Sequence, residues 1–185
     1  MNRLAAELHA SPRFDGFLNE FGLWWGVSRH EAGQMTLEHI LRDHEFTRGL
    51  GDAQIATLAS LASEVTFEDN EVVLVEGERS QAFYLVLTGS VSVELRTASY
   101  VVTVQALGPG KVFGWSALLE DHDTLFQVRA REKTTALRLD GAHLKAACYR
   151  DTLLGTEVLQ RALAVVAGRV KATEIRFAEM CGVRI

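Results

Sequence analysis

The sequence predicts an α+β fold in which helices precede a β-roll, or double-stranded jelly roll, and a long helix follows it. Three observations lead to this prediction. Apolar residues recur at helical spacing in residues 1–63, alternate with a period of two in residues 64–140, and return to helical spacing in residues 141–185. We therefore expect an N-terminal helical segment, a β-roll domain and C-terminal helices in these three ranges.

The N-terminal segment is expected to contain short amphipathic helices at 37–46 and 52–65, with His44 on the apolar face of the first. Ahead of them, FDGFLNEFGLWWG (14–26) holds five large aromatic residues and three glycines. Two interpretations of this stretch stay open. It packs on the roll or on a partner helix, or it forms a docking surface for another protein. A membrane-surface role is less favoured because flanking cations are missing.

Short strands are expected throughout residues 64–140. Runs such as FYLVLTGSVSVELR, SYVVTVQAL and TTALRLD are rich in β-branched and aromatic residues. Turn signals separate such runs about every 8–12 residues, a spacing typical of all-β barrels and jelly rolls.

The last helix carries a heptad seam with a 4-3-4-3 spacing over about three heptads. Its members are Leu159, Leu163, Val166, Val170, Thr173, Phe177 and Met180. Arg161 and Arg169 are expected on the charged outer face of this helix. The seam indicates a homodimer through residues 153–180, and the alternative is a helix that folds back on its own barrel.

Composition excludes several classes of protein. A formal net charge of −5 argues against non-specific binding to nucleic acid, which needs a basic surface. The two cysteines, Cys148 and Cys181, imply no disulfide framework and favour a reducing compartment. The N-terminus lacks a signal-peptide pattern, and no apolar run approaches the roughly 20 residues of a membrane span. We therefore expect a soluble cytoplasmic protein that does not associate with membranes.

No motif indicates catalysis or a cofactor. His122 is the one histidine of the β region, so the paired histidines of a barrel metal site are missing. His30, His39 and His44 lie near carboxylates in ordinary helical sequence rather than in a metal-ligand pattern. Neither a nucleophile elbow nor a P-loop is present. We predict a non-enzyme without a metal or cofactor.

Three runs together resemble a known family. They are FEDNEVVLVEGERSQAFYLVLTGSVSVEL, LGPGKVFGWSALL and VRAREKTTALRLDGAHLKAA. They resemble the cyclic-nucleotide-binding domain of the catabolite activator and Fnr group, of protein kinase A regulatory subunits and of cyclic-nucleotide-gated channels. The resemblance covers about residues 37–180 and implies a β-roll with a phosphate-binding cassette that begins at Gly114.

The resemblance also implies the residues of the ligand site. In the family, helix N–H groups and an arginine hold a cyclic phosphate, and a glutamate binds the ribose hydroxyl. Here Trp115 stands at the glutamate position, and Thr124 or Leu125 stands at the arginine position. The backbone contribution remains, and the predicted ligand-binding residues are Gly114, Trp115, Ser116, Ala117, Thr124 and Leu125.

The exchanged residues predict weak binding of cyclic AMP or cyclic GMP in the family's usual mode. A charge-assisted contact contributes about 1.5–3 kcal/mol and a neutral hydrogen bond about 1 kcal/mol. Losing both would weaken binding by about two to three powers of ten. Arg129 or Arg131 could turn inward to compensate, but both are expected to face solvent.

Two functions are consistent with these residues and with the family resemblance. The first is a regulatory module that senses a nucleotide-type second messenger or a diverged ligand through residues 108–130 and signals through a dimer helix. The alternative is a ligand-free protein–protein adaptor whose pocket is filled by Trp115. Family transcription factors place a DNA-binding domain after the long helix, and the sequence ends at Ile185, so DNA binding is not expected.

Overall fold

The structure is a computed structural model that describes residues 37–119, 123–124 and 126–182. These residues belong to one compact unit. Residues 37–43 are helical, and the later elements follow in this order: α3 (Asp52–Leu61), β1 (Ala62–Phe67), β2 (Val72–Leu74), β3 (Ala82–Thr88), β4 (Val91–Arg96), β5 (Val101–Leu107), β6 (Val112–Phe113), the 3₁₀ helix η1 (Trp115–Leu118), β7 (Gln127–Ala130), β8 (Thr134–Asp140), α4 (Gly141–Arg150) and α5 (Thr152–Met180). The aromatic stretch 14–26 lies outside the described residues.

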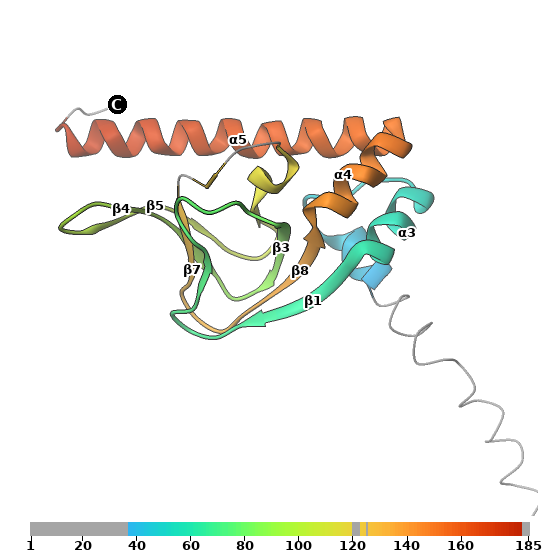
Figure 1. Ribbon diagram of the computed structural model, residues 1–185, viewed down its shortest axis with the longest axis horizontal. Coiled ribbons are helices and arrows are strands. Elements are labelled where there is room, and N and C mark those ends of the chain that lie inside the picture. Colours follow the sequence, from blue (N-terminus) through green and yellow to red (C-terminus); the bar gives the residue numbers. More distant parts are fainter. Residues whose placement is uncertain (1–36, 120–122, 125, 183–185) are drawn as a thin grey trace, which may run out of the picture. The chain divides into compact units, whose positions relative to one another are not determined.

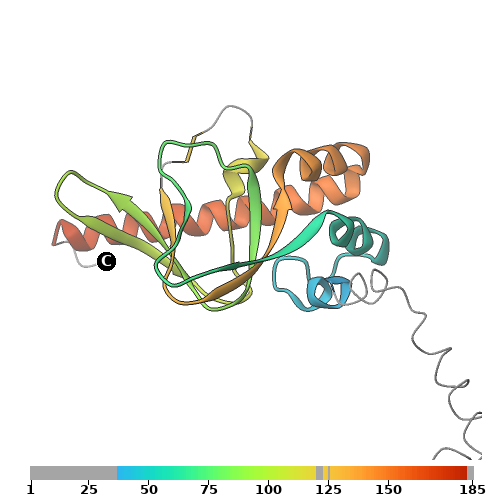
Figure 2. The ribbon, with the colours of Figure 1, turned by 60° about the horizontal axis from the view of Figure 1, so that its bottom comes forward.

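The strands of the described chain form two four-stranded sheets with the orders β1-β8-β3-β6 and β2-β7-β4-β5. All of their pairings are antiparallel. The two sheets enclose an apolar interior, and α3 and α4 gather at one end of the roll beside the start of α5 (Figure 2). The predicted α+β fold class with a β-roll is confirmed.

Strand β3 is the centre of the core because both of its faces are buried. Phe83 and Leu85 belong to the cluster that packs against the helices, whereas Tyr84 and Val86 belong to the cluster between the sheets. A strand buried on both faces reads as a continuous apolar run, which explains why its sequence, AFYLVLT, shows little alternation.

The predicted helix 52–65 is too long. Helix α3 ends at Leu61, and residues 62–67 form β1, which pairs with β8 from Ala62 opposite Leu139 to Phe67 opposite Thr134. The run Val65-Thr66-Phe67 has high strand propensity, and the ladder with β8 extends this strand back to the end of the helix.

His44 follows the helical residues 37–43 and is buried. Its Nδ1 accepts a hydrogen bond from the backbone N–H of Phe46 at 3.1 Å, so Nε2 carries the proton and donates to the carbonyl of Val86 at 3.2 Å. Burial lowers the pKa of His44, with the hydrogen bond to Val86 acting in the opposite direction. His44 is therefore a neutral structural link between the N-terminal helical turn and β3.

Helix α5 packs on its own roll through one face and leaves the heptad seam on another. Asp151 begins the helix by accepting hydrogen bonds from the N–H groups of Leu153 and Leu154. The helix then extends along one side of the molecule from α4 to the β4–β5 hairpin (Figure 1).

The face of α5 that meets the roll carries Leu154, Val158 and Ala162. In contrast, Leu163 and Phe177 of the seam are 68% and 69% exposed. The seam is thus not the surface with which the helix contacts its own roll. The homodimer stays a prediction.

Candidate functional site

The cassette begins at a glycine whose conformation and surroundings exclude a side chain. Gly114 has a φ of 79°, in the left-handed region, and a Cβ at this position would lie 2.3 Å from the carbonyl oxygen of Ala82. The turn leads directly into η1, where the N–H of Ala117 donates to the carbonyl of Gly114 at 3.0 Å. This places the first residues of η1 at the edge of the roll interior.

A cavity of about 440 Å³ opens beside η1, between the roll interior and α5. Its lining consists mainly of apolar side chains, with cassette residues on one side and one cation from α5. The lining residues are Leu74, Val93, Phe113, Gly114, Trp115, Ser116, Leu119, Asp123, Thr124, Phe126, Val128 and Arg169.

The structure brings together four of the six predicted ligand-binding residues at this cavity: Gly114, Trp115, Ser116 and Thr124. Ala117 is buried and lines a different cavity on the other side of η1. Leu125 lies outside the described residues. That the residues at the cavity bind a ligand stays a prediction.

Thr124 joins the cassette to the turn at residues 75–78. Its hydroxyl lies 2.6 Å from the carbonyl oxygen of Val75 and 2.8 Å from that of Glu78, so its single proton is shared between two acceptors. The backbone N–H of Thr124 donates to Glu78, and its carbonyl accepts from Gly77. Thr124, one of the two residues that the family resemblance places at the arginine position, is therefore already hydrogen-bonded within the protein.

Trp115 is half-buried and packs against the apolar cluster on the helix side of the roll. It also lines the cavity, whose volume remains open beside it. The indole therefore contributes to the core without filling the space next to the cassette.

Arg169 supplies the positive charge that the cassette sequence lacks. It comes from α5, is only 7% exposed, and is the one cation among the described residues that line this cavity. Its buried Nε has no hydrogen-bond partner among the described residues, and burial lowers the pKa of Arg169 to about 10. The expectation that Arg169 lies on the outer face of the helix is wrong.

Arg129 does not take part in this cavity. Its Nε lies 3.3 Å from the buried carboxylate of Glu94, and its guanidinium donates to the carbonyl of Asn70 at 2.8 Å. Arg131 is exposed. The expectation that both face solvent holds for Arg131, whereas Arg129 is half-buried in an ion pair.

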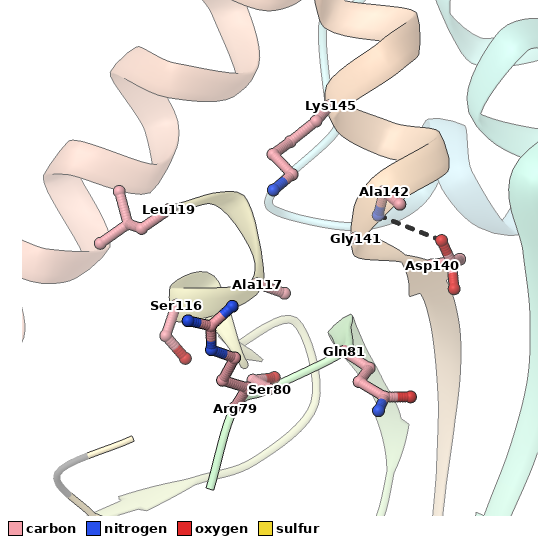
Figure 3. A pocket seen from close by; sticks show the side chains of 10 residues that line it. All are labelled: Arg79, Ser80, Gln81, Ser116, Ala117, Leu119, Asp140, Gly141, Ala142 and Lys145. Atoms are coloured by element: carbon pink, nitrogen blue, oxygen red, sulfur yellow. Dashed lines mark hydrogen bonds between the residues drawn. The ribbon is translucent and has the colours of Figure 1, made fainter. Parts of the chain in front are cut away.

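The cavity on the other side of η1 has a volume of about 490 Å³ and is lined by Arg79, Lys145, Ser80 and Ser116 among others (Figure 3). Both cations project toward it in the figure. The carboxylate of Asp140 accepts from the N–H groups of Ala142 and His143, so the first amides of α4 are already used. This cavity therefore offers side-chain cations but no free helix terminus.

The described residues contain no group of three His, Cys, Asp or Glu side chains close enough to share a metal ion. Within the same part of the chain, no helix combines the length and apolar character needed to cross a bilayer. Cys148 and Cys181 are free thiols.

The β-roll, the glycine-led cassette and the adjoining long helix define the class of protein. Residues 64–151 match the family described as the cyclic nucleotide-binding domain. With the fold, this match confirms the resemblance of residues 64–151 to the cyclic nucleotide-binding domain.

Among curated proteins, the cAMP-dependent protein kinase regulatory subunit of Dictyostelium discoideum is 28% identical over 115 residues, which are 60% of this chain and 35% of that protein. A putative potassium channel protein of Rhodopseudomonas palustris is 32% identical over 115 residues, which are 62% of this chain and 27% of that protein. The chain thus spans about a third or less of the length of these two relatives.

Solved structures share the fold. A cyclic nucleotide-binding domain from Methylobacillus flagellatus has a TM-score of 0.67 at 19% identity and covers 80% of this chain and 83% of its own. The regulatory subunit of a cAMP-independent protein kinase A from Trypanosoma brucei has a TM-score of 0.63 at 23% identity, covering 80% of this chain and 52% of its own. That second structure is a mutant with three substitutions, one of them threonine to arginine, bound to cyclic AMP.

Proposed function

We propose that this protein is a non-enzymatic regulatory module that binds a nucleotide-type or diverged ligand in the cassette cavity and signals through α5. The family match supports a regulatory role. The observation that carries the proposal is the cavity itself, because its lining joins the cassette residues to a side chain of α5. A ligand in this position would contact the cassette and the long helix at once.

The ligand is not expected to bind as cyclic AMP does in a domain with the family's arginine and glutamate. Trp115 replaces the glutamate, and Thr124, the residue that lines the cavity near the arginine position, is held by Val75 and Glu78. The protein from Trypanosoma brucei, described as cAMP-independent, is bound to cyclic AMP as a mutant in which one substitution is threonine to arginine. That pattern supports a diverged ligand here.

The open space beside Trp115 favours a ligand-binding module over a ligand-free adaptor. An adaptor with a filled pocket would leave little room, whereas about 440 Å³ remains. Ligand cavities of this size and apolar character bind small organic molecules in many proteins.

Isothermal calorimetry and thermal shift test this proposal. The panel contains cyclic AMP, cyclic GMP, cyclic dinucleotides and the corresponding nucleosides. We expect at least one of them to bind with millimolar or tighter affinity and to raise the melting temperature. No heat and no shift from any compound at high concentration would favour the adaptor.

A gain-of-function variant tests the assignment of the cassette. Trp115→Glu combined with Thr124→Arg restores both family groups, and we expect cyclic AMP to bind about 100- to 1,000-fold more tightly than to the wild type. The single variants are the controls, and each should gain less. Unchanged affinity in a folded double variant would contradict the placement of the ligand site.

We further propose that α5 pairs with α5 of a second copy through the exposed seam. Leu159, Leu163, Val170 and Phe177 are all more than half exposed in the single chain, and the spacing of the seam suits coiled-coil pairing. Sedimentation of Leu163→Asp and Val170→Asp should show loss of the dimer, whereas Lys171→Asp should leave it intact. Equal mass for all variants would contradict the seam.

Two further expectations belong to this proposal. The free thiols of Cys148 and Cys181 suit a reducing compartment, so we propose that the protein acts in the cytoplasm. We also propose that residues 14–26 dock a partner protein, because clustered aromatic residues make effective interface anchors.

A further inference from the structure

We infer that Arg169 is the anion-binding residue of the cassette cavity, so that the ligand carries a phosphate group bound at the α5 side of the cavity rather than at the family's arginine position. This inference rests on the proposed function, since it assumes that a ligand enters this cavity. It adds the chemical class of the ligand and the residue that selects it.

The position of Arg169 on α5 is the first argument. The buried face of the helix continues from Val158 through Ala162 and the half-buried Val165, and Arg169 is the next residue on that face. An apolar side chain would suit this position for packing alone. Instead, the longest cationic side chain occupies it, and it reaches the cavity that contains the cassette residues.

The absence of a partner for this guanidinium is the second argument. Arg169 forms no ion pair or side-chain hydrogen bond with the described residues, and its Nε is fully enclosed. Two carboxylates, Asp123 and Glu45, line cavities that Arg169 also lines, and each already has another cation as its partner. Asp123 lies 3.9 Å from Arg79, and Glu45 lies 2.9 Å from Lys111. The described residues therefore supply no counter-charge to this guanidinium.

The charge state of Arg169 is the third argument. Its pKa falls to about 10 through burial, so the guanidinium stays protonated at neutral pH. A buried cation without a partner is unfavourable, and proteins keep such groups where they bind something. A guanidinium presents a planar set of donors that matches two oxygens of a phosphate group.

The other residues that line the cavity indicate the chemical character of the rest of the ligand. Phe113, Phe126, Val93 and Val128 form apolar walls, and Trp115 offers an aromatic ring on the cassette side. These walls suit a flat, largely apolar group joined to the anionic one. A nucleotide fits this description, with its phosphate at Arg169 and its ring system toward the apolar walls.

This placement would couple the ligand directly to the long helix. Arg169 precedes Val170, a member of the exposed seam. Binding of an anion would neutralise a charge on α5 itself, so the energy of binding would act on the element proposed to pair with a second copy.

Calorimetry on the full chain tests the inference with charged and uncharged forms of one ligand body. The nucleotide probes are AMP, GMP and cyclic AMP, and each is compared with its nucleoside, adenosine or guanosine. Inorganic phosphate and pyrophosphate are compared with chloride at equal ionic strength. The variants are Arg169→Gln, Arg169→Lys and, as the matched control, Lys171→Gln, which removes an exposed cation from the same helix.

We expect the wild type to bind at least one phosphate-bearing nucleotide about 10- to 100-fold more tightly than its nucleoside. Arg169→Gln should abolish this preference, Arg169→Lys should keep part of it, and Lys171→Gln should keep all of it. In NMR spectra, the Nε–H signal that disappears in Arg169→Lys should shift when phosphate is added.

The outcomes separate the two proposals. Equal binding of nucleotide and nucleoside in the wild type, unaffected by Arg169→Gln, would overturn the role of Arg169 and leave the ligand cavity in place. Stabilisation by inorganic phosphate that needs Arg169, with no binding of any nucleotide or nucleoside, would support the anion site and reject the nucleotide. No response to any probe would overturn both.

Discussion

The guanidinium of Arg169 is buried and has no partner among the described residues, so we predict that removing its charge will stabilise the ligand-free protein. Arg169→Met is the suitable change because methionine keeps an unbranched side chain of similar reach and fills irregular space well. Most substitutions of a buried residue are destabilising, so a gain in stability is an unusual and informative result.

The size of the gain follows from the cost of burial. Burial lowers the pKa of Arg169 to about 10, a shift that corresponds to about 3 kcal/mol of lost hydration. This figure is an upper bound, because the arginine stem also packs against apolar neighbours and methionine recovers only part of those contacts. We expect the free energy of unfolding to rise by about 1–3 kcal/mol. For a domain of this size, the melting temperature should then rise by roughly 2–10 °C.

Urea unfolding followed by tryptophan fluorescence measures this gain directly, with no phosphate in the buffer. Lys171→Met is the control, because it removes an exposed cation two residues away and should change stability by less than about 0.5 kcal/mol. If Arg169→Met proves less stable than the wild type by about 1 kcal/mol or more, the guanidinium has a stabilising partner and the reasoning fails.

The remaining predictions concern pH and the cassette turn. Burial lowers the pKa of His44 in the folded protein, so its contribution to stability is complete above about pH 6.5 and is lost as the pH falls through the lowered value. His44→Gln should weaken this acid dependence of the unfolding midpoint, and an unchanged dependence would contradict the prediction. Gly114→Ala should lower the free energy of unfolding by about 3 kcal/mol or more, because the added Cβ would meet the carbonyl of Ala82. Gly77 has a similar φ but open space around it, so Gly77→Ala should lower the free energy of unfolding by only about 1–2 kcal/mol. Similar losses for the two glycine variants in thermal melts would contradict the steric role of the cassette glycine.

The architecture could be predicted because its signals are local. Strand propensity, turn residues and the runs around Gly77, Gly89 and Gly114 each depend on neighbours in the sequence, and all three glycines have positive φ values. The end of α3 was misplaced because residues 62–64 join β1 through a ladder with β8, about 75 residues further along the chain. Such pairing is invisible to a local pattern.

The candidate site could be predicted only in part for the same reason. The structure brings Gly114, Trp115, Ser116 and Thr124 of the cassette motif to one cavity, and that they bind a ligand stays a prediction. Arg169 was missed and assigned to the outer face, although it continues the spacing of Val158, Ala162 and Val165 on one side of α5. That spacing was the available signal.

The sequence by itself predicted the family resemblance and the order of elements. It also predicted, through that resemblance, the exchange of the two groups with which the family holds a cyclic nucleotide. The tertiary structure alone decided which face of α5 meets the roll, and thereby which arginine reaches the cassette. The physical reason is that periodicity defines the faces of a helix, while the orientation of those faces depends on the summed packing of residues distant in the chain. A charge on α5 could therefore be assigned to the cavity only after the helix was seen against the roll.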